Sequence, residues 1–233
     1  MSYTLSNRML YALSGVAALG LISMGMVIST WAQPSAQAIV TTPSAKTVPS
    51  GTAHPSPAPA TGVMAMTGTQ QLWQASVETL AGKTTTLAHG THGTAVIVMA
   101  SWCLYCGYED RYVIPQMVKA FPQLTIDIVD VSPQGGIADP GPMTPPFHGH
   151  DGSGGPLTIA GMRTTMQHYA KVYQIPPSVH VYVAPSATQS AWRVQSFPTW
   201  IFADGQGTIT HVAAGAFTVP AMKSTVAAGI AKP

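Results

Sequence analysis

The sequence predicts an α/β domain in which helices flank a sheet of mixed direction. Two observations predict this fold class. Short apolar or alternating runs are separated by segments with helical spacing, and a hairpin pattern and a last helix follow them. In addition, 46% of the 233 residues are hydrophobic and only 8% are charged, so the chain has enough apolar side chains for a buried core.

The N-terminal residues 1–31 are expected to form a cytoplasmic N-terminus and a transmembrane anchor. Residues 9–31 carry no charge, and a helix of that length can span a hydrocarbon core of about 30 Å. Arg8 precedes this run and no cation follows it before Lys46, which places the rest of the chain outside the cytoplasm. The alternative is a signal peptide cleaved near Ala36-Gln37-Ala38, which would give a secreted domain.

Residues 32–67 are predicted to be a linker, because they contain six prolines among Ala, Ser and Thr and only one charge, Lys46. The folded domain then covers residues 68–233. Its eight Lys and Arg balance its eight Asp and Glu, which argues against a nucleic-acid partner. The low charge density also suits an acidic exterior, where carboxylates would be protonated.

The first half of the domain contains four predicted elements and a long insertion. Residues 73–88 alternate around Gly82-Lys83 and predict an N-terminal β-hairpin. The apolar run 94–100 predicts a buried strand, and 104–121 predicts a helix that Pro115 kinks. A second strand over 124–131 precedes residues 132–161, where 14 of 30 residues are Gly or Pro, which predicts an irregular insertion.

The second half completes the α/β pattern. The expected elements are a helix over 162–173, a strand over 179–183, a helix over 187–194, strands over 199–203 and 208–213 joined by a turn at Asp204-Gly205, and a last helix over 219–230.

The chain has only two cysteines, and both lie in Trp102-Cys103-Leu104-Tyr105-Cys106, between a predicted strand and a predicted helix. Two cysteines are too few for a structural zinc site, which needs four ligands. A disulfide between them would close a small ring and give little entropic stabilisation. The spacing therefore indicates reversible redox chemistry.

The position of the pair assigns a different role to each cysteine. The unpaired N–H groups and the macrodipole at a helix N-terminus stabilise a thiolate and lower its pKa. We expect Cys103 to be an exposed nucleophile that attacks a substrate disulfide. Cys106, one turn further on, is expected to resolve the mixed disulfide.

Three segments of the sequence together resemble the thioredoxin superfamily, in particular its TlpA/ResA-like branch. They are the WCxxC segment after a buried strand, Ser196-Phe197-Pro198-Thr199 before a later strand, and the hairpin residues 75–83. The resemblance covers residues 71–230 and implies a thioredoxin-like fold and a thiol–disulfide oxidoreductase.

The resemblance also implies roles for three further residues. Pro198 matches the cis-proline that sits against the dithiol, Glu109 matches a proton-relay acid near the resolving cysteine, and Trp102 matches an aromatic that shields the site. The sequence departs from the family pattern at Ile97, where thioredoxin has a buried Asp, and at Arg111, where the helix proline usually lies.

The expected partners are proteins with cysteines or disulfides and a membrane electron donor. No cofactor is expected beyond a redox-active disulfide between Cys103 and Cys106. The direction of electron flow stays open, with reduction of substrates favoured by the resemblance.

Two other functions remain as alternatives. One is a copper-binding or copper-delivery module on the same fold, which would use the two sulfurs with His148 or His150 of the insertion, where Asp151 follows. The other is a peroxidase of related fold. It is disfavoured because Ala100 stands where that branch usually has Thr.

Overall fold

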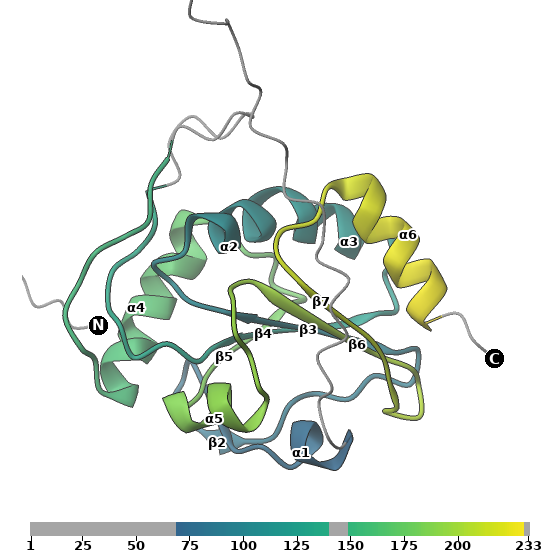
Figure 1. Cartoon of the computed structure of the whole chain (residues 1–233), viewed down its shortest axis with the longest axis horizontal. Coiled ribbons are helices and arrows are strands. Elements are labelled where there is room, and N and C mark those ends of the chain that lie inside the picture. The colour runs from purple at the N-terminus through teal and green to yellow at the C-terminus, as the bar shows by residue number, and fades with distance from the viewer. Residues whose placement is uncertain (1–68, 140–148, 231–233) are drawn as a thin grey trace, which may run out of the picture. The chain divides into compact units, whose positions relative to one another are not determined.

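The computed structural model describes residues 69–139 and 149–230 of the chain (Figure 1). The predicted anchor over 1–31 and the predicted linker over 32–67 lie outside the described residues. Within the described part, no helix combines the length and the apolar character that a membrane span requires.

Seven strands form one sheet in the order β2-β1-β5-β4-β3-β6-β7. Their bounds are β1 Val77–Thr79, β2 Thr84–Thr85, β3 Thr94–Met99, β4 Thr125–Asp130, β5 His180–Val183, β6 Thr199–Ala203 and β7 Ile209–Ala214. Strands β3, β4 and β5 run parallel, whereas β1, β2, β6 and β7 are each antiparallel to a neighbour. This arrangement confirms the predicted α/β fold with a mixed sheet.

The helices cover both faces of the sheet. Their bounds are α1 Thr69–Trp73, α2 Leu104–Tyr108, the π-helical turn η1 Glu109–Val113, α3 Ile114–Ala120, α4 Ile159–Val172, α5 Ser186–Ala191 and α6 Val219–Ile230. Helices α2, α3, α4 and α6 lie on one face, and α1 and α5 lie on the other (Figure 1). The sheet therefore forms the middle of three layers.

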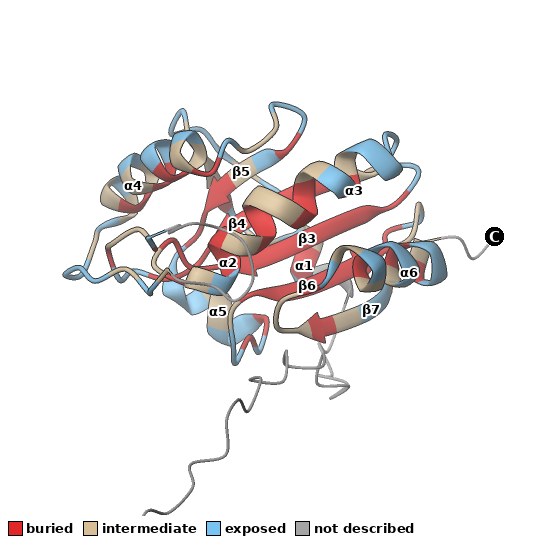
Figure 2. Cartoon of the chain, turned by 90° about the horizontal axis from the view of Figure 1, so that it is seen from above, coloured by how far each residue is buried: buried red, intermediate tan, exposed pale blue. Residues whose placement is uncertain are grey.

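The apolar run of β3 lies at the centre of this sheet and is buried on both faces (Figure 2). Ala95, Ile97 and Met99 pack in the core beneath α2, α3, α4 and α6. Val96 and Val98 pack in the second core, toward α1 and α5. A strand covered on both faces needs apolar residues at every position, which explains why the sequence shows a continuous run rather than an alternation.

Several predicted boundaries differ from the structure, among them those of the hairpin and of α4. Trp73, placed in the hairpin, ends α1, and the hairpin strands are only β1 and β2, which pair antiparallel. Helix α4 begins at Ile159 rather than at residue 162, because the Thr158 side chain accepts a hydrogen bond from Gly161 N and caps the helix. Gly161 is thus inside the helix, although its type suggested the insertion.

The predicted helix over 104–121 is divided by η1. Pro115 has no N–H, so the carbonyl one turn before it loses its backbone donor. The backbone widens just ahead of the proline, and Ile114 N–H donates to the Glu109 carbonyl five residues earlier. The predicted disturbance at Pro115 therefore takes the form of a π-helical turn, in which Glu109 and Asp110 are both buried.

The described part of the insertion consists of two arms, residues 133–139 and 149–157. They pair with each other at Gln134 and Pro156 and at Asp139 and His150. Several glycines permit this close approach. A Cβ on Gly152, for example, would lie 2.5 Å from the Ile137 carbonyl carbon.

Candidate active site

The two cysteines lie where β3 ends and α2 begins, and both are free thiols. Cys103 is the N-cap of α2, and its sulfur accepts a hydrogen bond from Cys106 N at 3.4 Å. Cys103 is only 5% exposed and Cys106 is fully buried. The expectation of an exposed Cys103 is therefore wrong, because the segment before β6 lies over it, with the Phe197 carbonyl oxygen 3.7 Å from its sulfur.

The two thiols differ in acidity as the sequence led us to expect. The hydrogen bond with the Cys106 side chain lowers the pKa of Cys103 most, and the hydrogen bond from the Cys106 backbone N–H lowers it further, although burial opposes both. Burial, followed by the hydrogen bond to Cys103, raises the pKa of Cys106 well above its usual value. Cys103 is thus the thiol that ionises first.

Glu109, the expected proton-relay residue, is fully buried. Its Oε1 accepts a hydrogen bond from the backbone N–H of Phe217, which lies just before α6. That N–H and the Trp200 indole favour the ionised form, but burial outweighs them and raises the pKa of Glu109 well above its ordinary value. Burial thus favours the protonated form of Glu109.

Asp110 is a residue that the sequence analysis did not single out. It is buried next to Glu109 but faces α4, where Tyr169 donates its hydroxyl to Asp110 Oδ2 at 2.6 Å. Burial raises the pKa of Asp110 to about 7, and its charge in turn raises the pKa of Cys106. The only signal in the sequence was a pair of adjacent acidic residues three and four positions after Cys106. The family pattern accounts for only one of them, Glu109.

Trp102 is held by hydrogen bonds as well as by packing. Its ring meets Phe197 edge to face at a centroid distance of 6.1 Å, and its indole N–H donates to Ser132 Oγ at 2.9 Å. Ser132 is itself held in place, because its backbone N–H donates to Asp130 Oδ1 at 2.9 Å. Trp102 thus borders the dithiol, between the end of β4 and the segment before β6.

Pro198 directly precedes β6, which pairs antiparallel with β3, the strand that leads to the dithiol. The Phe197–Pro198 peptide bond is cis, the geometry that the resemblance implied. A CxxC pair thus stands at the start of the helix after the central strand, and the Phe197 carbonyl, just before the cis-proline and an antiparallel strand, lies against Cys103. The fold is thioredoxin-like.

Comparison with solved structures finds similar proteins at low sequence identity. They include a thioredoxin-like protein from Aeropyrum pernix (14% identity, 66% of this chain and 88% of that chain, TM-score 0.49). They also include a secreted Mycobacterium tuberculosis disulfide oxidoreductase homologous to E. coli DsbE (15%, 68% and 98%, TM-score 0.48) and a thiol-disulfide isomerase from Corynebacterium glutamicum (16%, 70% and 97%, TM-score 0.46). No family model and no curated protein matches the chain.

The described residues contain no ligand set for the copper-binding alternative. His148 lies outside them. His150 Nε2 is 3.6 Å from Asp139 Oδ2, and the Asp151 carboxylate accepts from Leu104 N. Among residues 69–139 and 149–230, no three His, Cys, Asp or Glu side chains gather in a way that could hold a metal ion.

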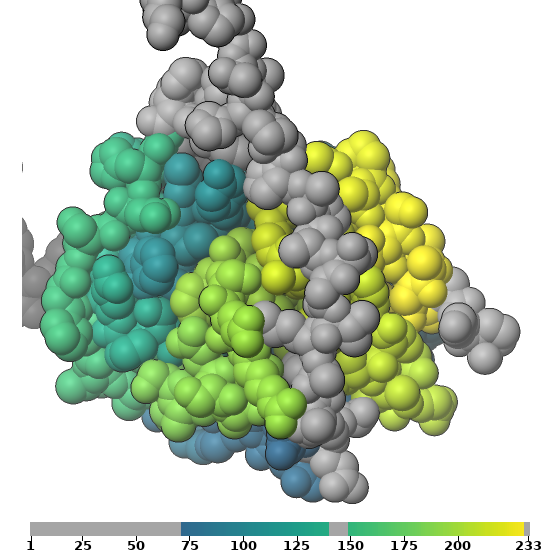
Figure 3. Space-filling model, viewed as in Figure 1, coloured from purple at the N-terminus to yellow at the C-terminus, as the bar shows by residue number. Residues whose placement is uncertain are grey.

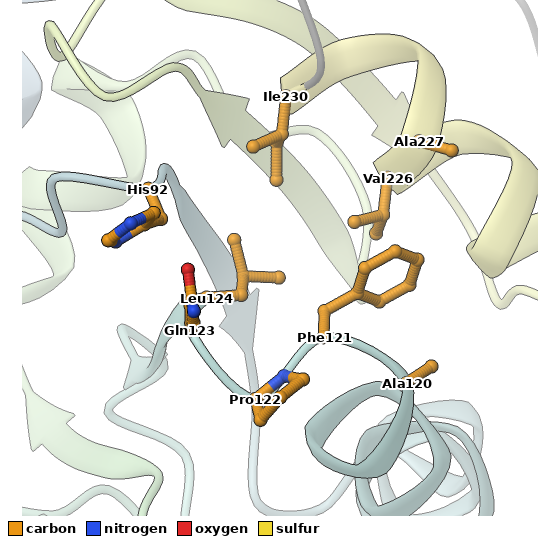
Figure 4. Close-up of a pocket in the computed structure, with 9 residues that line it drawn as sticks. All are labelled: His92, Ala120, Phe121, Pro122, Gln123, Leu124, Val226, Ala227 and Ile230. Atoms are coloured by element: carbon orange, nitrogen blue, oxygen red, sulfur yellow. The ribbon is translucent and has the colours of Figure 1, made fainter.

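A pocket of about 350 Å³ lies between the end of α3 and α6 (Figure 4). Its lining is mainly apolar and includes Phe121, Leu124, Val226 and Ile230. These residues lie at the end of the sheet where β3 and β4 begin, whereas the dithiol follows the end of β3. The pocket is therefore separate from the dithiol.

Proposed function

We propose that this protein is a thiol–disulfide oxidoreductase that exchanges disulfides with protein cysteines through Cys103 and Cys106. The observation that carries the proposal is the placement of the two thiols: Cys103 is the N-cap of α2, where its sulfur accepts from Cys106 N–H, and Cys106 is fully buried. In agreement with this placement, the pKa of Cys103 is lowered and that of Cys106 is raised. A dithiol of this kind has one group ready to attack and a second that reacts only after the first.

The reaction proceeds in two exchanges. The Cys103 thiolate attacks one sulfur of a substrate disulfide and forms a mixed disulfide, and the departing substrate thiolate takes a proton from water. Cys106 then loses its proton and attacks Cys103 Sγ, which releases the second substrate thiolate. Two electrons have passed to the substrate, which ends as two thiols, and the protein ends as the Cys103–Cys106 disulfide. The reverse sequence oxidises a substrate.

The proton of Cys106 needs an acceptor, because burial raises the pKa of this thiol. Glu109 and Asp110 follow Cys106 by three and four residues, so both start from the same side of the helix as Cys106. Asp110, whose pKa is about 7, can accept a proton near neutral pH. We assign proton transfer to this acidic pair, Pro198 to the surface that meets the substrate, and Trp102 to shielding of the sulfurs.

The N-terminal segment supports an extracytoplasmic location for this activity. The uncharged run over residues 9–31, with Arg8 before it, would anchor the domain on the extracytoplasmic side of a membrane, and a membrane electron donor could then return the disulfide to the dithiol. Reduction of substrates is the direction we favour.

Reduction of insulin by dithiothreitol, with the protein as catalyst, tests the proposal. The wild-type protein should accelerate the reduction, and Cys103→Ser should abolish the acceleration. Cys106→Ser should instead accumulate the mixed disulfide, because nothing resolves it. Full catalysis by Cys103→Ser would overturn the proposal, and stoichiometric binding of Cu(I) by a wild-type protein without exchange activity would favour the copper alternative.

A further inference from the structure

The arms of the insertion are bound to the backbone on both sides of Cys103. Ser101 O accepts from Ala138 N at 3.0 Å, and Trp102 O accepts from Gly152 N at 2.7 Å. On the other side of Cys103, Leu104 N–H donates to Asp151 Oδ1 at 2.8 Å. Figure 3 shows the teal segment of α2 at the surface between the green insertion and the lime residues that precede β6.

The Asp151 carboxylate and the Cys103 sulfur both accept hydrogen bonds from backbone N–H groups at the start of α2. The sulfur accepts from Cys106 N, and the Asp151 carboxylate accepts from Leu104 N. These are the groups that would otherwise stabilise a Cys103 thiolate. A carboxylate at this place takes one donor away and adds a negative charge beside the nucleophile. In agreement with this geometry, the charge of Asp151 raises the pKa of Cys103.

We propose that Asp151 is a positioning residue through which the insertion makes the Cys103–Cys106 pair more reducing than the same pair would be without this carboxylate. The inference rests on the proposed function. Reduction of the disulfide takes up two electrons and, while Cys103 stays a thiolate, one proton, which goes to Cys106. A negative charge beside Cys103 disfavours this reduced form and so lowers the reduction potential.

The other titratable groups around Cys103 come from three elements. Cys106 lies on α2, and Tyr173 follows α4 and interacts electrostatically with both cysteines. On the insertion, His150 Nδ1 lies 3.0 Å from the Asp151 carbonyl oxygen, and its other ring nitrogen faces Asp139. Asp151 reaches the backbone of α2 through its side chain, which accepts from Leu104 N.

The variant Asp151→Asn isolates the charge, because the amide keeps an oxygen for Leu104 N–H. We expect a lower pKa of Cys103, followed by the ultraviolet absorbance of the thiolate, and an equilibrium with glutathione shifted about threefold toward the dithiol, as expected for one exposed charge at a helix end. At about 30 mV for a tenfold change, this is a rise of about 14 mV in the reduction potential. Both differences from wild type should decrease as salt is raised.

Asp204→Asn is the matched control. Asp204 Oδ1 also accepts backbone N–H groups, from Gln206 and Thr208 at 2.9 Å, but in the turn after β6. It should leave the potential and the pKa of Cys103 unchanged. Asp151→Ser, which offers a neutral acceptor at the same place, is a second variant and should shift both in the same direction as Asp151→Asn.

Two results would overturn the inference. One is an unchanged pKa and potential in both Asp151 variants while the wild-type protein still exchanges disulfides. The other is an equal shift in Asp204→Asn. Failure of the proposed function would look different, since the wild-type protein would then not reduce insulin, although the pKa of Cys103 could still be compared between the variants.

Discussion

At the scale of single residues, the neighbouring carboxyls Glu109 and Asp110, three and four residues after Cys106, bind different parts of the fold. Glu109 binds the Phe217 N–H near α6, whereas Asp110 binds the Tyr169 hydroxyl on α4. Asp110 Oδ1 has no hydrogen-bond partner among the described residues, and burial raises the pKa of Asp110 to about 7. An incompletely bonded buried carboxyl beside a reactive thiol is typical of functional sites.

We predict that Asp110→Asn makes Cys106 more reactive. The charge of Asp110 raises the pKa of Cys106, so its removal should lower that pKa. In a Cys103→Ser background, Cys106 is the only thiol in the chain. Its alkylation rate at about pH 8 should rise severalfold when Asp110→Asn is added.

Asp127→Asn provides the comparison for this experiment. Asp127 is also buried and its pKa is raised to about 6, but it pairs with His180 toward the end of the sheet away from the dithiol. It should leave the alkylation rate of Cys106 unchanged. Equal rates with and without Asp110→Asn would show that this carboxylate does not act on Cys106.

At the scale of elements, the insertion is where the sequence was least informative. Its content of Gly and Pro predicted an irregular segment, but the arms over 133–139 and 149–157 pair with each other and dock on the CxxC segment. Composition cannot show this docking, because it depends on backbone hydrogen bonds between residues far apart in the chain. For the same reason Asp151 appeared in the sequence only as a weak metal ligand.

Two glycines of the insertion test whether its docking contributes to stability. In Gly152→Ala the new Cβ would lie 2.5 Å from backbone atoms of Ile137, so the arms would have to separate. We expect a loss of about 1–3 kcal/mol in the free energy of unfolding, measured with urea. At Gly155 nothing lies within 4 Å of the added Cβ, and Gly155→Ala should be neutral or slightly stabilising. Equal stabilities of the two variants would contradict close packing of the arms.

Helical elements were predicted with uneven success for identifiable reasons. The spacing of apolar residues located the helix after the dithiol, and Pro115 marked its disturbance. The sequence could not show that the backbone would respond with a π-helical turn, since a proline inside a helix is equally compatible with a simple kink. The Thr158 cap of α4 was readable in principle, but the glycine three residues later obscured it.

At the scale of the whole molecule, the acidic residues are distributed unusually. Four of the eight Asp and Glu in the chain are fully or almost fully buried, namely Glu109, Asp110, Asp127 and Asp130. Burial raises the pKa of Asp110 and Asp130 to about 7, that of Asp127 to about 6, and that of Glu109 well above its usual value. The low charge of the sequence suggested tolerance of acid, and these groups supply a physical cause.

We predict that the free energy of unfolding increases from pH 7 to about pH 4. Unfolded carboxyls titrate near pH 4, so between about pH 4 and 7 the folded state binds more protons than the unfolded state, and stability decreases as pH rises. Urea unfolding across this range measures the effect. Asp110→Asn should flatten the profile, because the amide does not titrate. A protein that loses stability steadily on acidification from pH 7 would contradict this distribution of pKa values.

The core fold and the position of the two cysteines could be predicted from the sequence because both depend on local patterns. The order of apolar runs predicted the mixed sheet, and the WCxxC segment predicted the place of Cys103 and Cys106. The low exposure of Cys103 could not be predicted, since it depends on Phe197, 94 residues away.

A redox titration tests the central claim most directly. The protein is equilibrated in glutathione buffers of increasing reducing power, free thiols are alkylated, and the number of modified cysteines is counted by mass. We predict one reversible two-electron transition between none and two alkylated cysteines, with a midpoint between about −270 mV, as in thioredoxin, and about −120 mV, as in DsbA. Two thiols that stay free in every buffer, or a disulfide that no buffer opens, would contradict the account.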